Sequence, residues 1–442
     1  MRSFHSFVAA RLALAAVGLA CGTGHCAAPA DALADYVQRP DASFGWKKLE
    51  QRTVEGCLAT RLECTSQTWR GYTWKHQLLV VWPPKVTNPD IAFLDIGSDA
   101  AVDSTFGSLR NIATRSGAIA ASINKVPNQP CYGGRREDEL IAYTFDQYIK
   151  SGDTTWPLLF PMVKSVVRGM DSVQAFAQQE FGQKVERFGG SGAAKRGGTT
   201  WLTAAVDPRV QGIAPRVFDM LNMKAQTRWA QQMYGAQSER IRAYTELHLV
   251  DRMDDPRMVD LRSWTDPWSY RARYRMPKLV LLGTNDPYWV VDALRHYWDD
   301  LPEPKLIFQT PNAGHDLAGN REAAPVLAAF VQMVADRQSL PRMSWEFKAD
   351  GSNAVAVAVS LDRPAKAFRL WEAASPIRDF RQAKWSSVKL PTDAGTNVVA
   401  KVQTPHNGFC AYLVEAELAL SSGQTYKLST EARVTPDGPP HR

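Results

Sequence analysis

The chain has 442 residues, of which 45% are hydrophobic and 22% are charged, a balance typical of a globular protein. This composition excludes a disordered chain and a fibrous repeat. The formal net charge is +7, but lysine and arginine are interspersed with acidic residues and form no basic run. We therefore expect no nucleic-acid partner.

The first 28 residues predict a signal peptide. Arg2 and Arg11 supply positive charge, an apolar run covers residues 12–20, and Cys26-Ala27-Ala28 offers small residues for cleavage. The apolar run is too short to span a bilayer. We expect an exported protein, periplasmic or secreted, that associates with the cell envelope. A lipid anchor on Cys21 is the lesser alternative, because the preceding residues match a lipoprotein signal only loosely.

Four cysteines follow the signal peptide: Cys57, Cys64, Cys131 and Cys410. In an oxidising compartment, Cys57 and Cys64 have the spacing to close a hairpin-sized disulfide loop, although the sequence alone does not fix the pairing. The histidine and cysteine spacings are not those of a zinc site. We expect neither a metal nor a cofactor.

Residues 29–340 alternate between strand, loop and helix. A short helix and an irregular segment are expected within residues 32–48. Strands are expected at residues 57–65, 77–82, 91–96, 118–123, 210–214, 278–282 and 305–309, and helices at residues 137–151, 158–181 and 195–205. This alternation predicts an α/β fold with a mostly parallel sheet covered on both faces.

Two further regions depart from this alternation. Residues 216–275 are helical in pattern and rich in aromatic residues, which predicts a cap over the carboxyl ends of the strands. Its aromatic residues either pack against one another or line a substrate pocket. Residues 341–434 contain short alternating segments that predict a small β-sandwich, and residues 435–442 are expected to be a disordered tail.

The glycine-rich segment from Phe188 to Trp201 has the form of a nucleophile elbow, the tight strand-to-helix turn that carries the nucleophile of a hydrolase. Two loops downstream carry an acid and a base, each after its own strand: Asp286 in Gly283-Thr284-Asn285-Asp286-Pro287, and His315 in Pro311-Asn312-Ala313-Gly314-His315. The order of elbow, acid and base is that of α/β-hydrolases.

Several stretches between residues 32 and 396 extend this pattern. They are Tyr36-Val37, Arg39-Pro40-Asp41, Thr65-Ser66-Gln67-Thr68-Trp69-Arg70, residues 126–130, 137–144, 156–159, 161–165, 195–197 and 199–210, Gly283 to Trp289, and Pro311 to His315. In these stretches the chain resembles the PhoPQ-activated pathogenicity-related proteins, an α/β-hydrolase group of exported or envelope-associated bacterial proteins. The resemblance implies that Asp286 is the triad acid and His315 the base.

The same resemblance places Ala194 at the nucleophile position. The family reads Gly-Ala-Ser-Lys-Arg-Gly where this chain reads Gly192-Ala193-Ala194-Lys195-Arg196-Gly197, and Gly198 stands where the family tends to have tryptophan. A methyl group cannot attack a carbonyl. The expected oxyanion donors are the backbone N–H of Lys195 and one from the loop of Gly97, Ser98 and Asp99. The side chains of Lys195 and Arg196 are expected to bind carboxylates or a ligand.

Three hypotheses about function remain. The first is a serine-hydrolase scaffold for ester or amide bonds in small molecules or peptides, inactive or strongly impaired because of Ala194. The second is an active hydrolase that uses Ser191, since Gly189-Gly190-Ser191-Gly192-Ala193 nearly satisfies the G-x-S-x-G spacing. The third is a non-catalytic binding protein of the cell envelope. Gly189 and Gly190 are also expected to weaken the strand that enters the turn.

Overall fold

The computed structural model describes residues 31–392 and 395–439. Nine strands form one sheet in the order β1-β2-β3-β5-β4-β6-β7-β8-β9. Their bounds are β1 (Gly45–Val54), β2 (Cys57–Trp69), β3 (Tyr72–Trp82), β4 (Ile91–Ile96), β5 (Ile119–Ile123), β6 (Arg187–Ala193), β7 (Val210–Arg216), β8 (Lys278–Gly283) and β9 (Lys305–Thr310). Strands β1, β2, β3 and β5 pair antiparallel, and all pairs from β5 to β9 are parallel. The carboxyl ends of β4 to β9 therefore meet at one edge.

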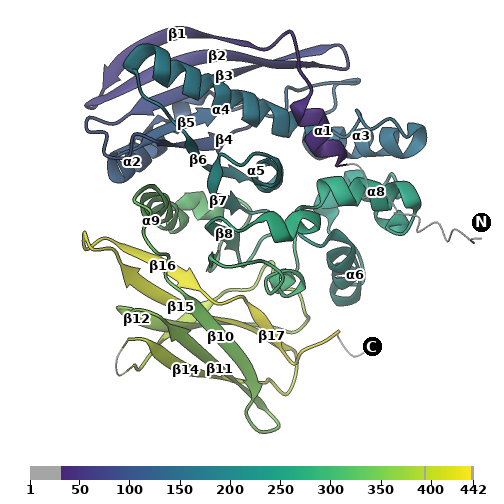
Figure 1. The fold of residues 1–442 in the computed structure, drawn as a ribbon. Helices are drawn as coiled ribbons and strands as arrows, with labels where there is room; N and C mark the ends of the chain where they lie inside the picture. The colour runs from purple at the N-terminus through teal and green to yellow at the C-terminus, as the bar shows by residue number, and fades with distance from the viewer. Residues whose placement is uncertain (1–30, 393–394, 440–442) are drawn as a thin grey trace, which may run out of the picture. The chain divides into compact units, whose positions relative to one another are not determined.

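Helices cover both faces of this sheet (Figure 1). On one face lie α1 (Ala32–Gln38), α3 (Glu137–Ser151), α4 (Leu159–Phe181) and α5 (Lys195–Val206), whose buried side chains share a core with Leu78, Val80 and Leu94. On the other face lie α2 (Phe106–Ser116) and α9 (Ala323–Ala335), with Leu79, Val81 and Phe93. Alternate residues of one strand thus point into two different cores, which explains why these strands read as continuous apolar runs.

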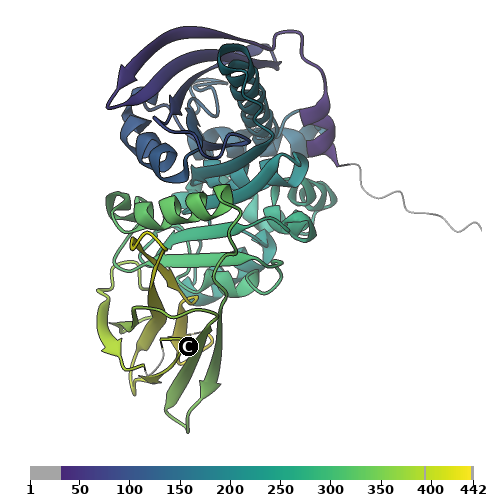
Figure 2. The same cartoon turned by 60° about the vertical axis from the view of Figure 1, so that its left-hand side comes forward.

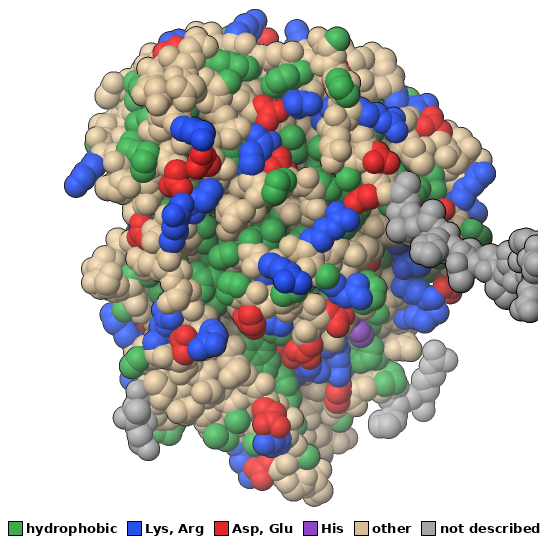
Figure 3. Space-filling model, viewed as in Figure 1, with side chains coloured by type: hydrophobic (Ala, Val, Ile, Leu, Met, Phe, Trp, Pro, Cys, Tyr) green, Lys and Arg blue, Asp and Glu red, His purple; other side chains and the backbone are tan. Residues whose placement is uncertain are grey.

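The cap lies between β7 and β8, as predicted. It consists of α6 (Met223–Tyr234), η2 (Glu239–Ile241), α7 (Arg242–Thr245), η3 (Val250–Arg252), α8 (Pro256–Thr265) and η4 (Pro267–Arg273). None of the helices in the described ranges is long and apolar enough to cross a membrane. On the face drawn in Figure 3, basic and acidic side chains lie intermixed.

The C-terminal strands form two antiparallel sheets, drawn green to yellow in Figures 1 and 2. One sheet contains β10 (Met343–Ala349), β11 (Ala354–Leu361) and β14 (Asn397–Gln403). The other contains β12 (Ala367–Ser375), β13 (Ser386–Leu390), β15 (Phe409–Ala419), β16 (Thr425–Ser429) and β17 (Arg433–Thr435). Together they form a small β-sandwich whose inner faces share a core with α9.

Three expectations need correction. Residues 45–48, expected to be irregular, belong to strand β1, which continues to Val54. The proposed Cys57–Cys64 disulfide is wrong, because both residues lie seven positions apart in the extended strand β2 and so about 23 Å apart; all four cysteines are free and buried. The tail is ordered through residue 439, because Thr435 belongs to β17 and the Asp437 carboxylate pairs with Arg295 at 2.8 Å. The predicted signal peptide and Cys21 lie outside the described residues.

Candidate active site

The turn between β6 and α5 places Ala194 at its tip. Ala194 has φ 52° and ψ −122°, a conformation that costs energy for any residue with a side chain and that is found where function requires it. The flanking glycines are required by close approach: a Cβ on Gly192 would lie 2.6 Å from the carbonyl oxygen of Arg196, and one on Gly197 would lie 2.7 Å from Cβ of Phe218. The backbone is therefore that of a nucleophile elbow, with a methyl group in place of the nucleophile.

The structure argues against Ser191 as the nucleophile. Ser191 lies within β6, between Asp95 of β4 and Ala214 of β7, and its side chain is fully buried. Its Oγ donates a hydrogen bond to the carbonyl of Ala214 at 2.7 Å. Ser191 is therefore part of the sheet interior and does not face His315.

The expected acid and base do meet. Asp286 and His315 follow the neighbouring parallel strands β8 and β9, and Oδ2 of Asp286 lies 2.7 Å from Nδ1 of His315. The Asp286 carboxylate is buried, whereas the His315 ring is 27% exposed. The second Asp286 oxygen accepts the backbone N–H of Tyr288 at 2.9 Å. Asp286 is thus oriented to hold the imidazole with Nε2 free for a reacting group.

Both segments that were expected to supply oxyanion donors lie at the elbow. Lys195 is the first residue of α5, where a helix leaves its N–H groups without intrahelical acceptors. The loop after β4 follows the strand that pairs with β6, so it borders the elbow. The N–H of Gly97, however, already donates to the carbonyl of Ile123 at 2.7 Å. Gly97 is therefore not a free donor, and Ser98 stays a prediction.

A cavity of about 130 Å³ opens beside Ala194 and His315. Lys195, Asp138 and Tyr288 also border it, and the Tyr288 ring lies against the His315 ring with centroids 4.4 Å apart. Most of the remaining wall is aliphatic or thioether: Ile141, Leu159, Met220, Met223, Leu249, Met253, Met258 and Leu261. The cap therefore lines a pocket, mainly with aliphatic and thioether side chains, together with the aromatic residues Phe218 and Tyr244. Its tryptophans Trp229, Trp264 and Trp268 are not among the lining residues.

Carboxylates of α3 hold both cations that follow the elbow. Arg196 donates two hydrogen bonds to Glu137 at 2.7 Å, and Nζ of Lys195 lies 2.7 Å from Oδ2 of Asp138. Burial alone would raise the pKa of Glu137, but the bonds and charge of Arg196, the bond from Gln129 and the charge of Lys195 together outweigh burial and lower the pKa to about 2. Tyr244 of the cap donates to the other Asp138 oxygen at 3.1 Å. The ion pair between Lys195 and Asp138, together with the bond from Tyr244, therefore joins the elbow, α3 and the cap.

The sequence interpretation did not identify Asp138 or Tyr244. A signal for Asp138 was present, because three acidic residues, Glu137 to Glu139, open helix α3, where negative charge is favourable. No sequence pattern pointed to Tyr244, which is 106 positions away from its partner. In the part of the chain that the structure describes, His, Cys, Asp and Glu form no group that could hold a metal ion.

The mixed sheet, the elbow after β6, and the acid and base after β8 and β9 define an α/β-hydrolase-fold protein. Residues 33–381 match the family model of the PhoPQ-activated pathogenicity-related proteins, and the chain belongs to this family. It is 30% identical over 456 residues to autocrine proliferation repressor protein A of Dictyostelium discoideum, covering 92% of this chain and 90% of that protein.

Solved structures with a similar fold include two hydrolases. Acetyl xylan esterase 1 from Thermoanaerobacterium sp. superimposes with a TM-score of 0.49 and 15% identity, over 68% of this chain and 91% of the esterase. An S-formylglutathione hydrolase from Agrobacterium tumefaciens gives a TM-score of 0.43 and 15% identity, over 66% of this chain and all of that chain.

Proposed function

We propose that this chain is an exported member of its family that binds an ester or amide ligand on a serine-hydrolase scaffold and hydrolyses it weakly or not at all. One observation carries the proposal: Ala194 occupies the strained tip of the elbow beside a complete Asp286–His315 pair. Export is inferred from residues 1–28 of the sequence, with Cys21 lipidation as the lesser alternative.

With alanine at position 194, attack by a serine on the carbonyl is lost, and attack by a water molecule remains. A serine at this position would lose its proton to Nε2 of His315 as it attacks the carbonyl, and Asp286 would stabilise the imidazolium that forms. With alanine there, His315 has only water to activate. Hydrolases without a triad nucleophile retain about 10³–10⁴-fold catalysis over the uncatalysed reaction through their oxyanion and binding groups. We expect activity of that order at most.

The cavity defines the ligand class. Its volume of about 130 Å³ and its apolar wall are close to those of cavities of about 150 Å³ that bind benzene. Lys195 and Asp138 at its border form an ion pair at 2.7 Å, so neither offers an unpaired charge to a ligand. The favoured ligand is therefore an ester or amide of a small molecule or peptide, with an apolar group about the size of a benzene ring in the cavity and its carbonyl next to Ala194.

The test is the substitution Ala194→Ser, assayed with phenylacetyl and acetyl esters of one chromogenic alcohol. Serine has nearly the volume of alanine and can take the same backbone angles, so the fold is expected to stay intact. We expect kcat/KM to rise by about 10³-fold or more over the unchanged chain, with phenylacetyl preferred. The double variant Ala194→Ser/His315→Ala is the control and should lose the gain. A folded Ala194→Ser protein with no gain on any ester or amide would contradict the proposal.

A second candidate is a binding protein with no catalytic role. It is supported by Ala194 together with the name of the Dictyostelium relative, which states an effect on proliferation and no reaction. This candidate predicts that the unchanged chain binds a phenylacetyl amide while Ala194→Ser remains inactive. Both candidates predict that the unchanged chain binds this amide in a calorimetric titration, so the activity of Ala194→Ser separates them.

A further inference from the structure

We propose that Asn285 and Asn312 are positioning residues for the acid–base pair. Each fastens one of the two loops that carry Asp286 and His315 to the segment of residues 378–385, which connects β12 and β13 of the β-sandwich. The sandwich thereby becomes part of the apparatus that sets the geometry between Asp286 and His315. This inference goes beyond the proposed function, because it holds whether or not position 194 carries a nucleophile.

Asn285 immediately precedes the acid. Its side-chain Nδ2 donates to the carbonyls of Ala383 at 2.7 Å and Phe380 at 3.0 Å, and its Oδ1 accepts from the hydroxyl of Thr284 at 2.8 Å. Its backbone N–H donates to the carbonyl of Ala313 in the base loop at 2.9 Å. Both the nitrogen and the oxygen of the Asn285 amide therefore form hydrogen bonds. The backbone next to Asp286 is held by the sandwich segment and by the base loop.

Asn312 lies three residues before the base and makes a reciprocal pair with the sandwich. Its Nδ2 donates to the carbonyl of Trp385 at 2.9 Å, and its Oδ1 accepts the backbone N–H of Trp385 at 2.8 Å. Its own N–H donates to the hydroxyl of Thr284 at 3.0 Å. Asn312 has φ 57°, a left-handed conformation that asparagine tolerates better than most residues. The two asparagines therefore tie both loops to each other and to one segment of the sandwich.

The segment that receives these bonds is firmly anchored. Phe380 and Trp385 are buried in a cluster with Val291, Leu413 and Val434, which joins the loop after β8 to the face of the β12–β15 sheet that points away from the sandwich core. Arg378, at the start of the segment, is fully buried and pairs with the equally buried Asp292 at 2.8 Å. An anchor of this kind does not move freely in solvent, so bonds to it restrict the loops.

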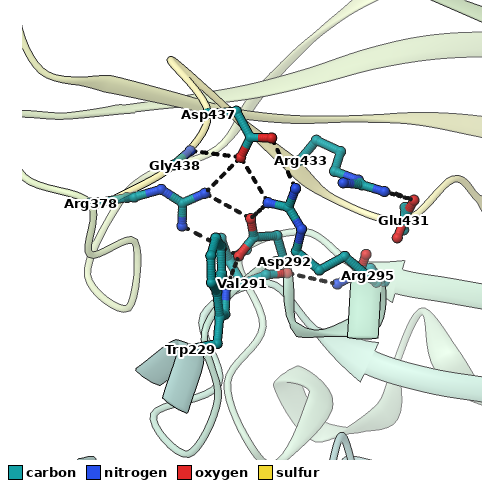
Figure 4. Close-up of polar contacts among 10 residues, drawn as sticks. Trp229, Val291, Asp292, Arg295, Arg378, Glu431, Arg433, Asp437 and Gly438 are labelled. Atoms are coloured by element: carbon teal, nitrogen blue, oxygen red, sulfur yellow. Dashed lines mark hydrogen bonds and ion pairs between the residues drawn. The ribbon is translucent and has the colours of Figure 1, made fainter. Parts of the chain in front are cut away.

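The same anchor extends to the cap (Figure 4). Asp292 accepts a hydrogen bond from Nε1 of Trp229 on α6 at 3.0 Å, and Arg295 pairs with Asp437 of the chain end at 2.8 Å. Helix α6 supplies Met223 to the cavity wall. The sandwich thus contacts both the acid–base loops and a helix that lines the pocket.

Other bonds hold the sandwich to the hydrolase part without touching these loops. The N–H of Gln309 donates to Oγ of Ser429 at 3.0 Å, and Lys427 pairs with Glu322 at 2.7 Å. Loss of one asparagine amide therefore leaves the sandwich attached. The expected effect of such a loss is local, on the distance between Asp286 and His315, and not the release of the sandwich.

The test uses the unchanged full-length chain and measures the proton on Nδ1 of His315 by NMR. A proton shared with a carboxylate at 2.7 Å gives a far-downfield signal, which the variant His315→Gln assigns by removing it. We expect Asn285→Ala and Asn312→Ala to shift or abolish this signal in folded protein. Ser429→Ala is the matched control: it also removes one buried bond across the same contact, and should leave the signal unchanged.

A second readout uses the Ala194→Ser background, where kcat should fall about tenfold in each asparagine variant while KM changes less than twofold. If an alanine variant does not fold, Asn285→Ser and Asn312→Ser, which keep a hydroxyl there, are measured in the same way. An unaltered downfield signal in both folded asparagine variants overturns the inference. An equal loss of the downfield signal in Ser429→Ala also overturns the inference. Because the NMR readout needs no catalysis, an inactive Ala194→Ser protein would contradict the proposed function alone.

Discussion

Gly190 shows how a residue that looks unfavourable in the sequence is accommodated in the structure. With Gly189 it stands in the middle of β6, which is paired with β4 on one side and β7 on the other along this stretch. Small voids of about 10 Å³ border both glycines, on the α9 side and on the α4 side of the sheet. The ladder with β4 is continuous, whereas the ladder with β7 shifts its register between Phe188 and Gly189. What the glycines lack is side-chain packing.

This arrangement predicts that Gly190→Ala stabilises the protein. A Cβ there would lie 3.7 Å from Cγ2 of Thr200, an ordinary contact, and it would also restrict the unfolded chain. We expect the free energy of unfolding in urea to rise by about 0.4–1 kcal/mol. Gly192→Ala is the matched control in the same strand and should destabilise, because its Cβ would collide with the backbone of Arg196. A Gly192→Ala protein more stable than Gly190→Ala would contradict this interpretation.

At the scale of elements, the sequence predicts best where apolar residues dominate. The segment of residues 91–96 and the helix of residues 137–151 are observed with the predicted bounds. Strand β1 was missed because it lies at the sheet edge with residues 47–53 exposed, so it has no apolar alternation to detect. Its stability comes from the ladder with β2, a partner that the sequence does not specify.

The candidate site also contains residues that could be predicted from the sequence and residues that could not. Asp286 and His315 could be predicted because each directly follows a buried strand, and parallel strands bring such loops to one edge. Asn285 and Asn312 could not, because their partners lie 98 and 73 positions away in another part of the chain. An asparagine beside a turn is common, and only tertiary contacts distinguish these two.

The ion pairs between α3 and the elbow give a prediction about acid stability. The pKa of Glu137 is lowered to about 2 in the folded protein, against 4.5 for the free side chain, because the hydrogen bonds and charges of Arg196, Gln129 and Lys195 together outweigh burial. A carboxyl group with a depressed folded pKa stabilises above its unfolded pKa, and this contribution disappears as the pH falls from about 4.5 to 2.

Glu137→Gln should therefore be less stable than the unchanged chain at pH 7, and the difference should shrink as the pH falls through that window. Urea denaturation at several pH values between 7 and 2.5 measures it. Glu346→Gln, which removes an exposed carboxylate paired with Lys348 on β10, is the control and should show almost no difference at any of these pH values. A difference for Glu137→Gln that stays constant down to pH 2.5 would show that the ion pair is not its cause.

At the scale of the whole molecule, the β-sandwich and the α/β part share one core. Leu327 and Phe330 of α9 belong to the same buried cluster as Val357 and Leu428 of the sandwich. The rings of Trp298 and Trp345 stack across the two parts with centroids 5.8 Å apart. Because this shared surface is apolar, neither part is expected to be stable without the other.

The full chain should therefore unfold in a single calorimetric transition, and a chain that ends at residue 340 should aggregate or lose its cooperative transition. Truncation exposes the sandwich-facing side of α9 and the ring of Trp298, and it removes Arg378 from Asp292, which keeps Arg295 as its ion-pair partner. The full chain with Val388→Lys, a change at an exposed site of the sandwich, should keep the single transition. Two separate transitions in the full chain, or a cooperative and soluble truncated chain, would show that the parts are independent and that the sandwich does not stabilise the site.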